Sequence, residues 1–315
     1  MSIIRFSRTA LQQAVRDAAQ GAYVADAAVS RPWLRLLGLI PLTAVLAFVA
    51  AVFVGGGMAA MGVDPTAFAD RIPDGPARLD GEVVFVALLA ASLLIIAVAV
   101  LIAAMIVYRR PAAAFLWPRR RFSLRLLVIG FAVMTGLCLL IWPLSEWVEP
   151  MKTLPPLFDP AWSIQTRINY AAATAVFLLI AAAAEEIAFR AVLLKVMAGL
   201  TQKIWLLCLL NALLFAVIHL DPDPTAFIAR AMMGFIWTWA ALRLGGIEFA
   251  IGAHWANNLF IAWLAEPMSS AALPSQTLPP YVLAIEAVIC VVVFIFIERI
   301  ARNRGSIAHA RVMNA

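Results

Sequence analysis

The stretch that determines the fold of this protein is Val83–Tyr108, which reads VVFVALLAASLLIIAVAVLIAAMIVY. It contains no charged residue, and a membrane-spanning helix needs about 20 predominantly apolar residues to cross the hydrocarbon core of a bilayer. The stretch therefore predicts a transmembrane helix.

Apolar stretches of comparable length lie on both sides of this one. They are Trp33–Met58, Leu126–Trp147, Ile168–Ala198, Ile204–Leu220, Thr225–Leu244, Phe249–Ala265 and Tyr281–Ile297. Together they predict an all-α, polytopic transmembrane bundle of about eight spanning helices. The composition excludes a soluble enzyme, since 13% of the 315 residues are charged against about 25% in soluble domains. It also excludes a disordered chain, because 64% of the residues are hydrophobic and the mean hydropathy is +0.94.

The charged residues sort the connections between these stretches. Arginines crowd the connection at 109–125 and the tail at 299–311, whereas acidic residues fill the connections at 64–82 and 146–159. The positive-inside rule then places both termini in the cytoplasm, and we expect a bacterial inner membrane. The net charge of +6 is explained by this topology and by anionic lipid headgroups, so nucleic acid is not an expected partner.

Four regions follow from this pattern. Residues 1–32 form a cytoplasmic segment in which Ser7–Ala27 has the spacing of an amphipathic surface helix. Residues 33–166 hold the first three spans, residues 167–266 hold the next four, and residues 267–315 hold the last span and a basic tail.

The spans of region 167–266 carry polar side chains that are unusual inside a membrane. An ionisable side chain at the centre of a membrane helix costs about 2.5–3.5 kcal/mol on insertion scales and often marks a functional site. The polar residues within the later spans are Glu185, Glu186, Arg190, Asn211, His219, Arg230, His254, Asn257, Asn258 and Glu286.

The first cluster lies in the sequence AAAAEEIAFR, residues 181–190. Glu186 and Arg190 have the i, i+4 spacing of a helical ion pair, which would leave Glu185 to face another helix or a cavity. Apolar surroundings would prepare such a carboxylate for general acid–base work. A purely structural ion pair or an interfacial helix end explains the cluster equally well.

Two further clusters show helical spacing. Asn211, Phe215 and His219 are spaced i, i+4, i+8, and His254 and Asn258 are spaced i, i+4. His254 and Asn258 could donate two hydrogen bonds to one oxyanion. Taken alone, a hydrogen-bonded helix end and an interhelical hydrogen bond are the simpler interpretations. Taken together, the three clusters supply a base, an orienting group and oxyanion donors, which predicts a hydrolytic site.

The motifs EExxFR at Glu185–Arg190, FxxxH at Phe215–His219 and HxxxN at His254–Asn258, in this order, resemble those of the CPBP family. This family of CAAX proteases and bacteriocin-processing enzymes, also called Abi, comprises intramembrane endopeptidases related to the type II CAAX prenyl endopeptidase. The resemblance covers about residues 170–262. It implies that Glu185 activates water with help from His219, that His254 and Asn258 stabilise the oxyanion, and that Glu186 and Arg190 orient the site.

The resemblance also implies the cofactor and the substrate. A glutamate peptidase without a metal is favoured, because no HExxH helix is present and Asn258 suits an oxyanion better than zinc. The alternative is zinc held by Glu185, His219 and His254. The implied substrate is a membrane-associated peptide or protein, either of prenylated CAAX type or similar to a bacteriocin.

Two other classes of function remain open. A small secondary transporter or proton relay would use Glu185, Glu186, His219, Arg230 and Glu286, although no inverted repeat is visible. A catalytically silent immunity or scaffold protein of the same fold would not need Glu185. Residue counting also places Glu185 near the cytoplasmic end of its span and His219 near the opposite end of the next, so the two would meet only if the span boundaries shift.

Overall fold

The computed structural model describes residues 8–61, 79–148, 154–268 and 278–313, and all regular structure within these ranges is helical. The long helices are α3 (Pro32–Ala60), α5 (Leu79–Tyr108), α7 (Leu124–Val148), α8 (Ile164–Glu186), α11 (Pro224–Leu244) and α14 (Tyr281–Met313). The shorter ones are α1 (Arg8–Gln20), α2 (Ala22–Ala25), α6 (Ala113–Leu116), α9 (Leu194–Ala198), α10 (Ile204–Val217) and α12 (Glu248–Phe260). Two π-helical segments, η1 (Ile187–Leu193) and η2 (Ile261–Ala265), continue α8 and α12 directly.

Five helices among the described residues are long and apolar enough to cross a membrane, which makes the chain an integral, multi-pass membrane protein. They are α3, α5, α7, α11 and α14. The expected number of about eight spans is not confirmed. The apolar helix α10 has only 14 residues and α12 has 13, while α8 carries charged residues near both ends.

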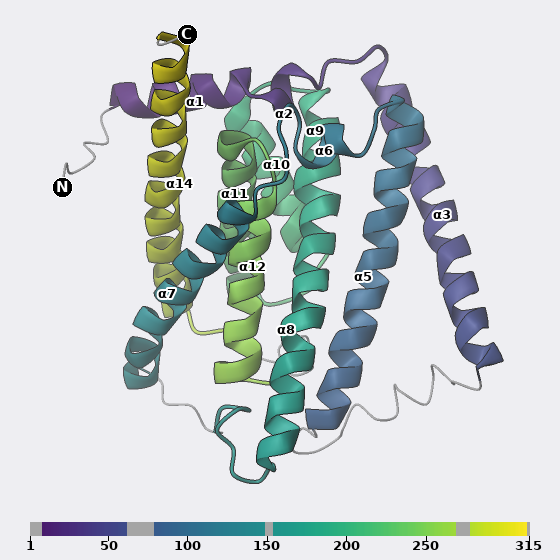
Figure 1. Cartoon of the computed structure of the whole chain (residues 1–315), viewed down its shortest axis with the longest axis vertical. Coiled ribbons are helices and arrows are strands. Elements are labelled where there is room, and N and C mark those ends of the chain that lie inside the picture. The colour runs from purple at the N-terminus through teal and green to yellow at the C-terminus, as the bar shows by residue number, and fades with distance from the viewer. Residues whose placement is uncertain (1–7, 62–78, 149–153, 269–277, 314–315) are drawn as a thin grey trace.

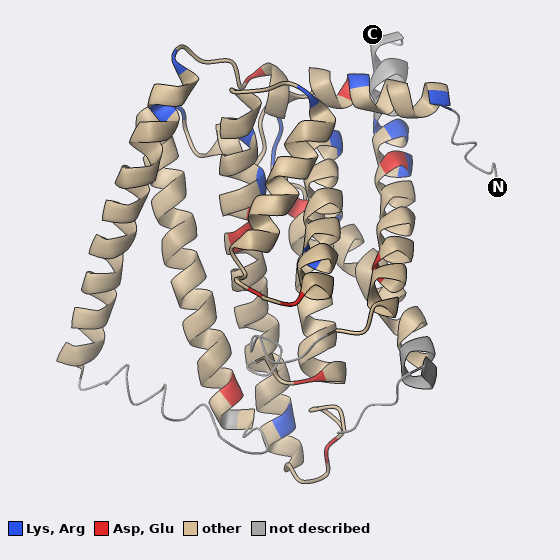
Figure 2. Ribbon diagram, turned by 180° about the vertical axis from the view of Figure 1, so that it is seen from behind, with Lys and Arg blue, Asp and Glu red and all other residues tan. Residues whose placement is uncertain are grey.

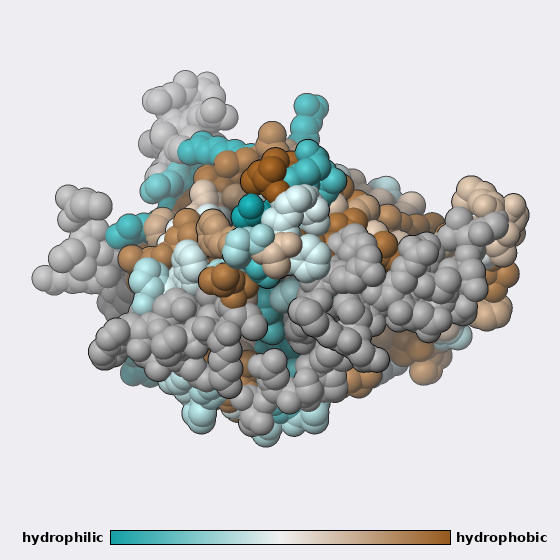
Figure 3. Space-filling model, turned by 90° about the horizontal axis from the view of Figure 1, so that it is seen from below, coloured by the Kyte–Doolittle hydropathy of each residue, from teal (hydrophilic) through white to brown (hydrophobic). Residues whose placement is uncertain are grey.

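The helices stand side by side, and α1 lies across one end of the bundle, where α14 also ends (Figure 1). Most of the blue Lys and Arg residues in Figure 2 lie toward this end. Seen from the other end, brown apolar side chains extend along the sides of the molecule (Figure 3). On the outer helix α3, for example, Phe48 is 70% and Phe53 is 77% exposed. Large apolar side chains that point outward fit a lipid environment.

The most enclosed of the five spanning helices is α11, which packs between α10 and α14. Helix α12 packs between α7 and α8. At the crossing of α12 with α7, a Cβ atom added to Gly252 would lie 2.0 Å from the carbonyl oxygen of Leu127. A Cβ atom added to Gly130 would lie 2.1 Å from that of Phe249. The two glycines therefore permit a close backbone approach that fixes α12 in place.

The first residue of α12 is also fixed by charge. Glu248 is fully buried, and its Oε1 accepts hydrogen bonds from Arg120 Nη1 and from the backbone N–H of Ser123, both at 2.7 Å. Arg120 additionally donates from Nε to the carbonyl oxygen of Gly245 at 2.7 Å. This arrangement joins the connection before α7 to the start of the helix that carries His254.

The continuous helix α8–η1–α9 corrects the expected depths of Glu185 and His219. It ends at Ala198, and α10 begins at Ile204 after a short connection. Glu185 precedes that connection by roughly 20 Å of helix, and His219 follows it by about the same length. The two residues therefore lie at similar depth without any shift of the helix boundaries, because depth is set by distance from their shared turn.

Candidate functional site

A buried ion pair on α8 and η1 forms the centre of the candidate site. Arg190 Nη1 lies 3.1 Å from Glu186 Oε1, and both side chains are completely inaccessible. The predicted i, i+4 pair is therefore present. The same oxygen of Glu186 lies 3.0 Å from Nδ1 of His254, which α12 carries and which is 4% exposed. One carboxylate thus joins two segments that are 68 residues apart in the chain.

Aromatic rings enclose this cluster. The indole of Trp237 on α11 stacks on the His254 imidazole, with ring centroids 4.4 Å apart and planes at 19°. The Arg190 guanidinium lies over the Phe215 ring, 4.2 Å from its centroid, and also faces Trp237. Stacked rings restrict the rotation of the imidazole, and cation–π contact partly replaces the hydration that Arg190 has lost.

The π-helical segment η1 is stabilised from the neighbouring helices. A π-helix shifts the backbone hydrogen-bond register, so some carbonyl groups need other partners. The carbonyl oxygen of Phe189 accepts a hydrogen bond from Asn211 Nδ2 at 2.9 Å, and Asn211 Oδ1 accepts one from Thr238 Oγ1 at 2.9 Å. Asn211, predicted as a member of the α10 stripe, therefore supports the segment that carries Arg190.

The second π-helical segment has a similar partner. Tyr170 on α8 donates a hydrogen bond from its hydroxyl group to the carbonyl oxygen of Ala262 in η2, at 2.7 Å. The two π-helical segments thus follow the two helices that carry Glu186 and His254, and each is held by a side chain from another helix. Single-turn π segments occur frequently at functional sites.

Glu185 and His219 lie beside this centre. Oε2 of Glu185 is buried and has no hydrogen-bond partner among the described residues. Nδ1 of His219 lies 2.7 Å from the carbonyl oxygen of Phe215, while its side chain is exposed. The side chains of Glu185, His254 and Arg230 are close enough to interact electrostatically with the imidazole of His219. The predicted residues from α8, α10 and α12 therefore come together, although no hydrogen bond joins Glu185 to His219.

The hydrogen bonds define which imidazole nitrogens can react. A carbonyl oxygen only accepts, so Nδ1 of His219 carries the proton and Nε2 is left as an acceptor in the neutral ring. The carboxylate of Glu186 likewise accepts a hydrogen bond from Nδ1–H of His254, so this ring can also donate from Nε2 only as an imidazolium. The half-buried Asn258 makes no side-chain hydrogen bond to the part of the chain that the structure describes, which leaves its amide available.

Two polar residues of the later spans, Arg230 and Glu286, make no hydrogen bond to Glu186, Arg190 or His254. Arg230 pairs with Asp221 in the connection between α10 and α11, at 2.5 Å from Nη1 to Oδ2. Oε2 of Glu286 on α14 is buried and lacks a hydrogen-bond partner within the described ranges. Sequence reasoning missed Trp237 and Thr238. The two residues are adjacent in α11, so they do not form a stripe along one helix face. The one available signal was that Thr238 is one of only two threonines in this apolar helix.

The residues offered as zinc ligands do not form a ligand set. No three His, Cys, Asp or Glu side chains in the described ranges are grouped so that they could hold a metal ion. Nδ1 of His254 lies against Glu186 and Nδ1 of His219 against the carbonyl oxygen of Phe215, so Nε2 is the nitrogen that each ring could offer to a ligand.

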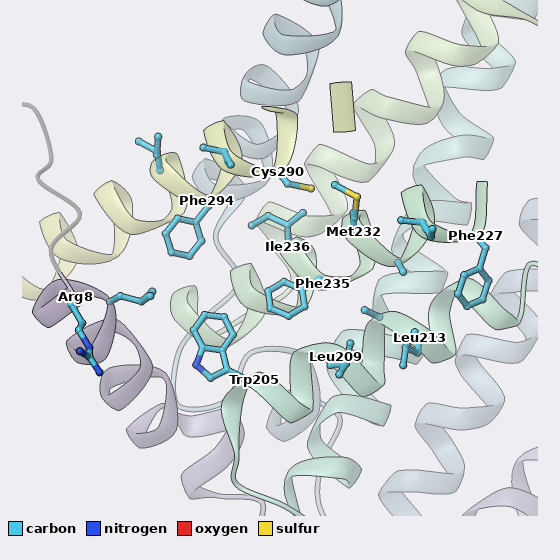
Figure 4. Close-up of a pocket in the computed structure, with 16 residues that line it drawn as sticks. Arg8, Trp205, Leu209, Leu213, Phe227, Met232, Phe235, Ile236, Cys290 and Phe294 are labelled. Carbon is cyan, nitrogen blue, oxygen red and sulfur yellow. The ribbon is translucent and has the colours of Figure 1, made fainter. Parts of the chain in front are cut away.

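An apolar groove of about 720 Å³ lies on another face of α11 (Figure 4). Side chains from α1, α10, α11 and α14 line it, including Trp205, Leu209, Phe235 and Phe294. None of Glu185, Glu186, His219, His254 and Asn258 lines this groove. The polar cluster, rather than the groove, therefore provides reactive chemistry.

Comparisons with known proteins find similarity in the part of the chain that contains this cluster. Residues 167–260 match the family model described as type II CAAX prenyl endopeptidase Rce1-like, and this range includes every member of the cluster. The chain is also 28% identical over 162 residues to the uncharacterized protein YyaK of Bacillus subtilis (strain 168). That alignment covers 49% of this chain and 52% of YyaK. The chain therefore spans about half the length of this relative. No solved structure gives a significant match. Residues 167–260 thus relate this chain to the CPBP family of CAAX proteases.

Proposed function

We propose that this protein is an intramembrane endopeptidase that hydrolyses a peptide bond in a membrane-associated peptide or protein. The observation that supports this proposal most strongly is the buried contact of Glu186 with both Arg190 and His254, next to the unpartnered carboxylate of Glu185. An unpartnered carboxylate in a membrane protein is costly, and water or substrate would supply the missing partner.

In the proposed mechanism, Glu185 takes a proton from a water molecule, and the water oxygen attacks the carbonyl carbon of the scissile peptide bond. Nε2 of His219, fixed as an acceptor by the bond from Nδ1 to Phe215, orients the same water molecule. The carbonyl oxygen becomes an oxyanion in a tetrahedral intermediate. When the C–N bond breaks, Glu185 returns the proton to the leaving amine, and the other product is a carboxylic acid.

The oxyanion receives hydrogen bonds from the side-chain amide of Asn258 and from Nε2 of His254. The second donor requires an imidazolium, which the carboxylate of Glu186 stabilises through Nδ1. Trp237 holds the ring plane through stacking. Glu186, Arg190 and Trp237 are therefore positioning residues, since they act through His254 rather than on the substrate.

We assign this reaction to a metal-free glutamate mechanism. The substrate that fits best is a membrane-associated peptide of CAAX type, which the family match favours, or one similar to a bacteriocin. We further propose that the protein resides in a bacterial inner membrane with both termini in the cytoplasm. The arginines gathered at the end where α1 lies support this orientation (Figure 2).

Peptidase activity of the detergent-purified protein tests the proposal. Cleavage of a quenched-fluorescence peptide panel that includes farnesylated CAAX peptides would be compared between wild type and Glu185→Ala, His219→Ala and His254→Ala. We expect each variant to lose activity by about a hundredfold or more, as is typical when a general base or oxyanion donor is removed. Retained cleavage in Glu185→Ala would refute the assignment of the base.

Two controls separate the alternatives. We expect a strong chelator to leave cleavage unchanged, whereas loss that added zinc restores would contradict the metal-free mechanism. We also expect Glu286→Gln to be active, because its buried Oε2 has no hydrogen-bond partner within the described ranges. Inactivation by Glu286→Gln would instead favour a proton relay. An inactive wild type with unchanged phenotype on Glu185→Ala would favour a silent scaffold.

A further inference from the structure

A second cavity, of about 510 Å³, lies between α2, α6 and α9, away from the proposed catalytic cluster. These helices lie at the end of the bundle that α1 crosses (Figure 1). The side chains of Asp26, Arg110, Arg119 and Lys195 line the cavity, together with Ala114 and Pro118. Three cations and one carboxylate leave two uncompensated positive charges in this cavity.

Lys195 at the wall of the cavity is 4% exposed, which is unusual for a lysine. Its Nζ donates a hydrogen bond to the carbonyl oxygen of Ala114 at 2.6 Å. The rings of Tyr23 and Phe115 lie 5.9 and 6.0 Å from Nζ. An ammonium group has three N–H donors. Among the described residues, only the carbonyl oxygen of Ala114 accepts a hydrogen bond from Nζ of Lys195.

The neighbouring charges do not compensate Lys195. Arg110 and Arg119 repel its ammonium group, and within the described ranges Asp26 is the one anion that attracts it. Asp26 is already engaged, since its carboxylate pairs with Arg119 and its carbonyl oxygen accepts a hydrogen bond from Arg110. A bound dianion would relieve the repulsion among the three cations and accept the remaining donors.

We propose that this cavity binds a phosphate monoester or inorganic phosphate. The two uncompensated charges match a phosphomonoester, which carries about −1.5 to −2 at neutral pH. The location at the arginine-rich end of the bundle suits either a phosphatidic acid headgroup in the facing leaflet or a soluble phosphate. Lys195 lies in α9, which follows η1 directly, so the ligand would contact the same continuous helix that carries Glu186 and Arg190.

The test uses the full-length protein in detergent with two kinds of probe. Native mass spectrometry would compare binding of dioleoyl phosphatidic acid with that of dioleoyl phosphatidylglycerol, whose phosphodiester carries a single charge. Thermal unfolding would be followed while inorganic phosphate is titrated against chloride at constant ionic strength. We expect phosphatidic acid, inorganic phosphate or both to bind, and phosphatidic acid to bind more tightly than phosphatidylglycerol.

The variants Arg110→Gln/Arg119→Gln and Lys195→Gln remove charges from the cavity. Each lost charge-assisted hydrogen bond should weaken binding about tenfold. The matched control Arg109→Gln/Arg121→Gln removes the same charge from the same connection, but neither residue lines the cavity, and we expect less than about a twofold change. If Lys195→Gln does not fold, Arg110→Gln/Arg119→Gln still tests whether the probes bind in this cavity, because Arg110 is half-buried and Arg119 is exposed.

Each outcome has one meaning. Binding of inorganic phosphate alone supports a soluble ligand, and binding of phosphatidic acid alone supports a lipid headgroup. Absence of binding by both probes overturns the proposal, as does equal weakening in the control pair. Because neither assay measures peptidase activity, failure of this proposal and failure of the proposed function are distinguishable.

Discussion

The two adjacent carboxylates on α8 have opposite surroundings, although they differ by one position in the chain. Oε1 of Glu186 accepts from Arg190 and His254 in full burial, while its Oε2 has no hydrogen-bond partner among the described residues. Oε2 of Glu185 is likewise buried without a partner, and no described residue donates a hydrogen bond to Glu185. Helical geometry explains this difference, because consecutive residues point about 100° apart. One carboxylate therefore holds the structure together, and the other is left available for chemistry.

This difference predicts opposite effects of conservative substitutions. We expect Glu186→Gln to destabilise the protein by about 3–5 kcal/mol, because it leaves the buried charge of Arg190 uncompensated. Glu185→Gln removes an unpartnered buried carboxylate, so the thermal midpoint should be unchanged or higher while peptidase activity is lost. Thermal unfolding and cleavage assays on the two variants would test this, and equal destabilisation by both would contradict the structure.

At the scale of single residues, the sequence predicted the Glu186–Arg190 pair and the stripe that contains Asn211 and His219. It could not predict that Glu186 also contacts His254, since a contact across 68 positions depends on the tertiary packing of α8 against α12. The roles of Glu185, His219, His254 and Asn258 remain predictions that the activity assays test.

At the scale of helices, the crossing of α7 and α12 determines where His254 lies. Gly252 and Gly130 face backbone carbonyl groups so closely that neither position has room for a methyl group. We expect Gly252→Ala to force the helices apart, at a cost of about 1–3 kcal/mol or more, and to reduce activity by moving His254 away from Glu186.

A matched control exists on α7 itself. A Cβ atom at Gly136 would meet nothing within 4 Å, so Gly136→Ala should be neutral or slightly stabilising through helix propensity. Thermal unfolding of both variants, with cleavage rates, checks the prediction. A Gly252→Ala variant as stable and active as Gly136→Ala would show that the close crossing is not needed.

The helices themselves were largely predictable, and their boundaries less so. Val83–Tyr108 lies within α5 and Thr225–Leu244 within α11, because long apolar runs define both. The predicted stretch Ile168–Ala198 ends where α9 ends, but the expected depth of Glu185 was wrong, because its depth is set by its distance from the turn before α10. The π-helical segments could not be predicted from hydropathy either. They depend on hydrogen bonds from Asn211 and Tyr170, which lie on other helices, to backbone carbonyl groups of η1 and η2.

At the scale of the whole molecule, Asp223 connects parts of the chain that are far apart. It caps α11 through the backbone N–H groups of Thr225 and Ala226, and its Oδ2 accepts from the N–H of Leu278 before α14, at 2.9 Å. The bond from Leu278, and then those from Ala226 and Thr225, lower the pKa of Asp223 below its ordinary value of 3.8.

A lowered pKa in the folded state means that the carboxylate stabilises the fold above its ordinary pKa. This stabilisation is lost as pH falls through the lower, folded value. We therefore expect wild type to unfold at a higher temperature than Asp223→Asn at pH 7, with the difference narrowing below pH 3.8. Thermal unfolding from pH 7 to pH 3 tests this prediction, and a difference that grows on acidification would contradict it.

The π-helical segment η1 has a consequence for tolerance to insertion and deletion. A π turn accommodates one more residue than an α turn within the same length of helix. Deletion of a single residue from Ile187–Leu193 could therefore convert the segment to ordinary α-helix without breaking the rod. The side chains beyond it, including Lys195, would then keep their orientation relative to Glu185, because the π turn had absorbed the additional residue. The seven residues of η1 therefore form the part of this rod in which the loss of one residue is expected to be tolerated.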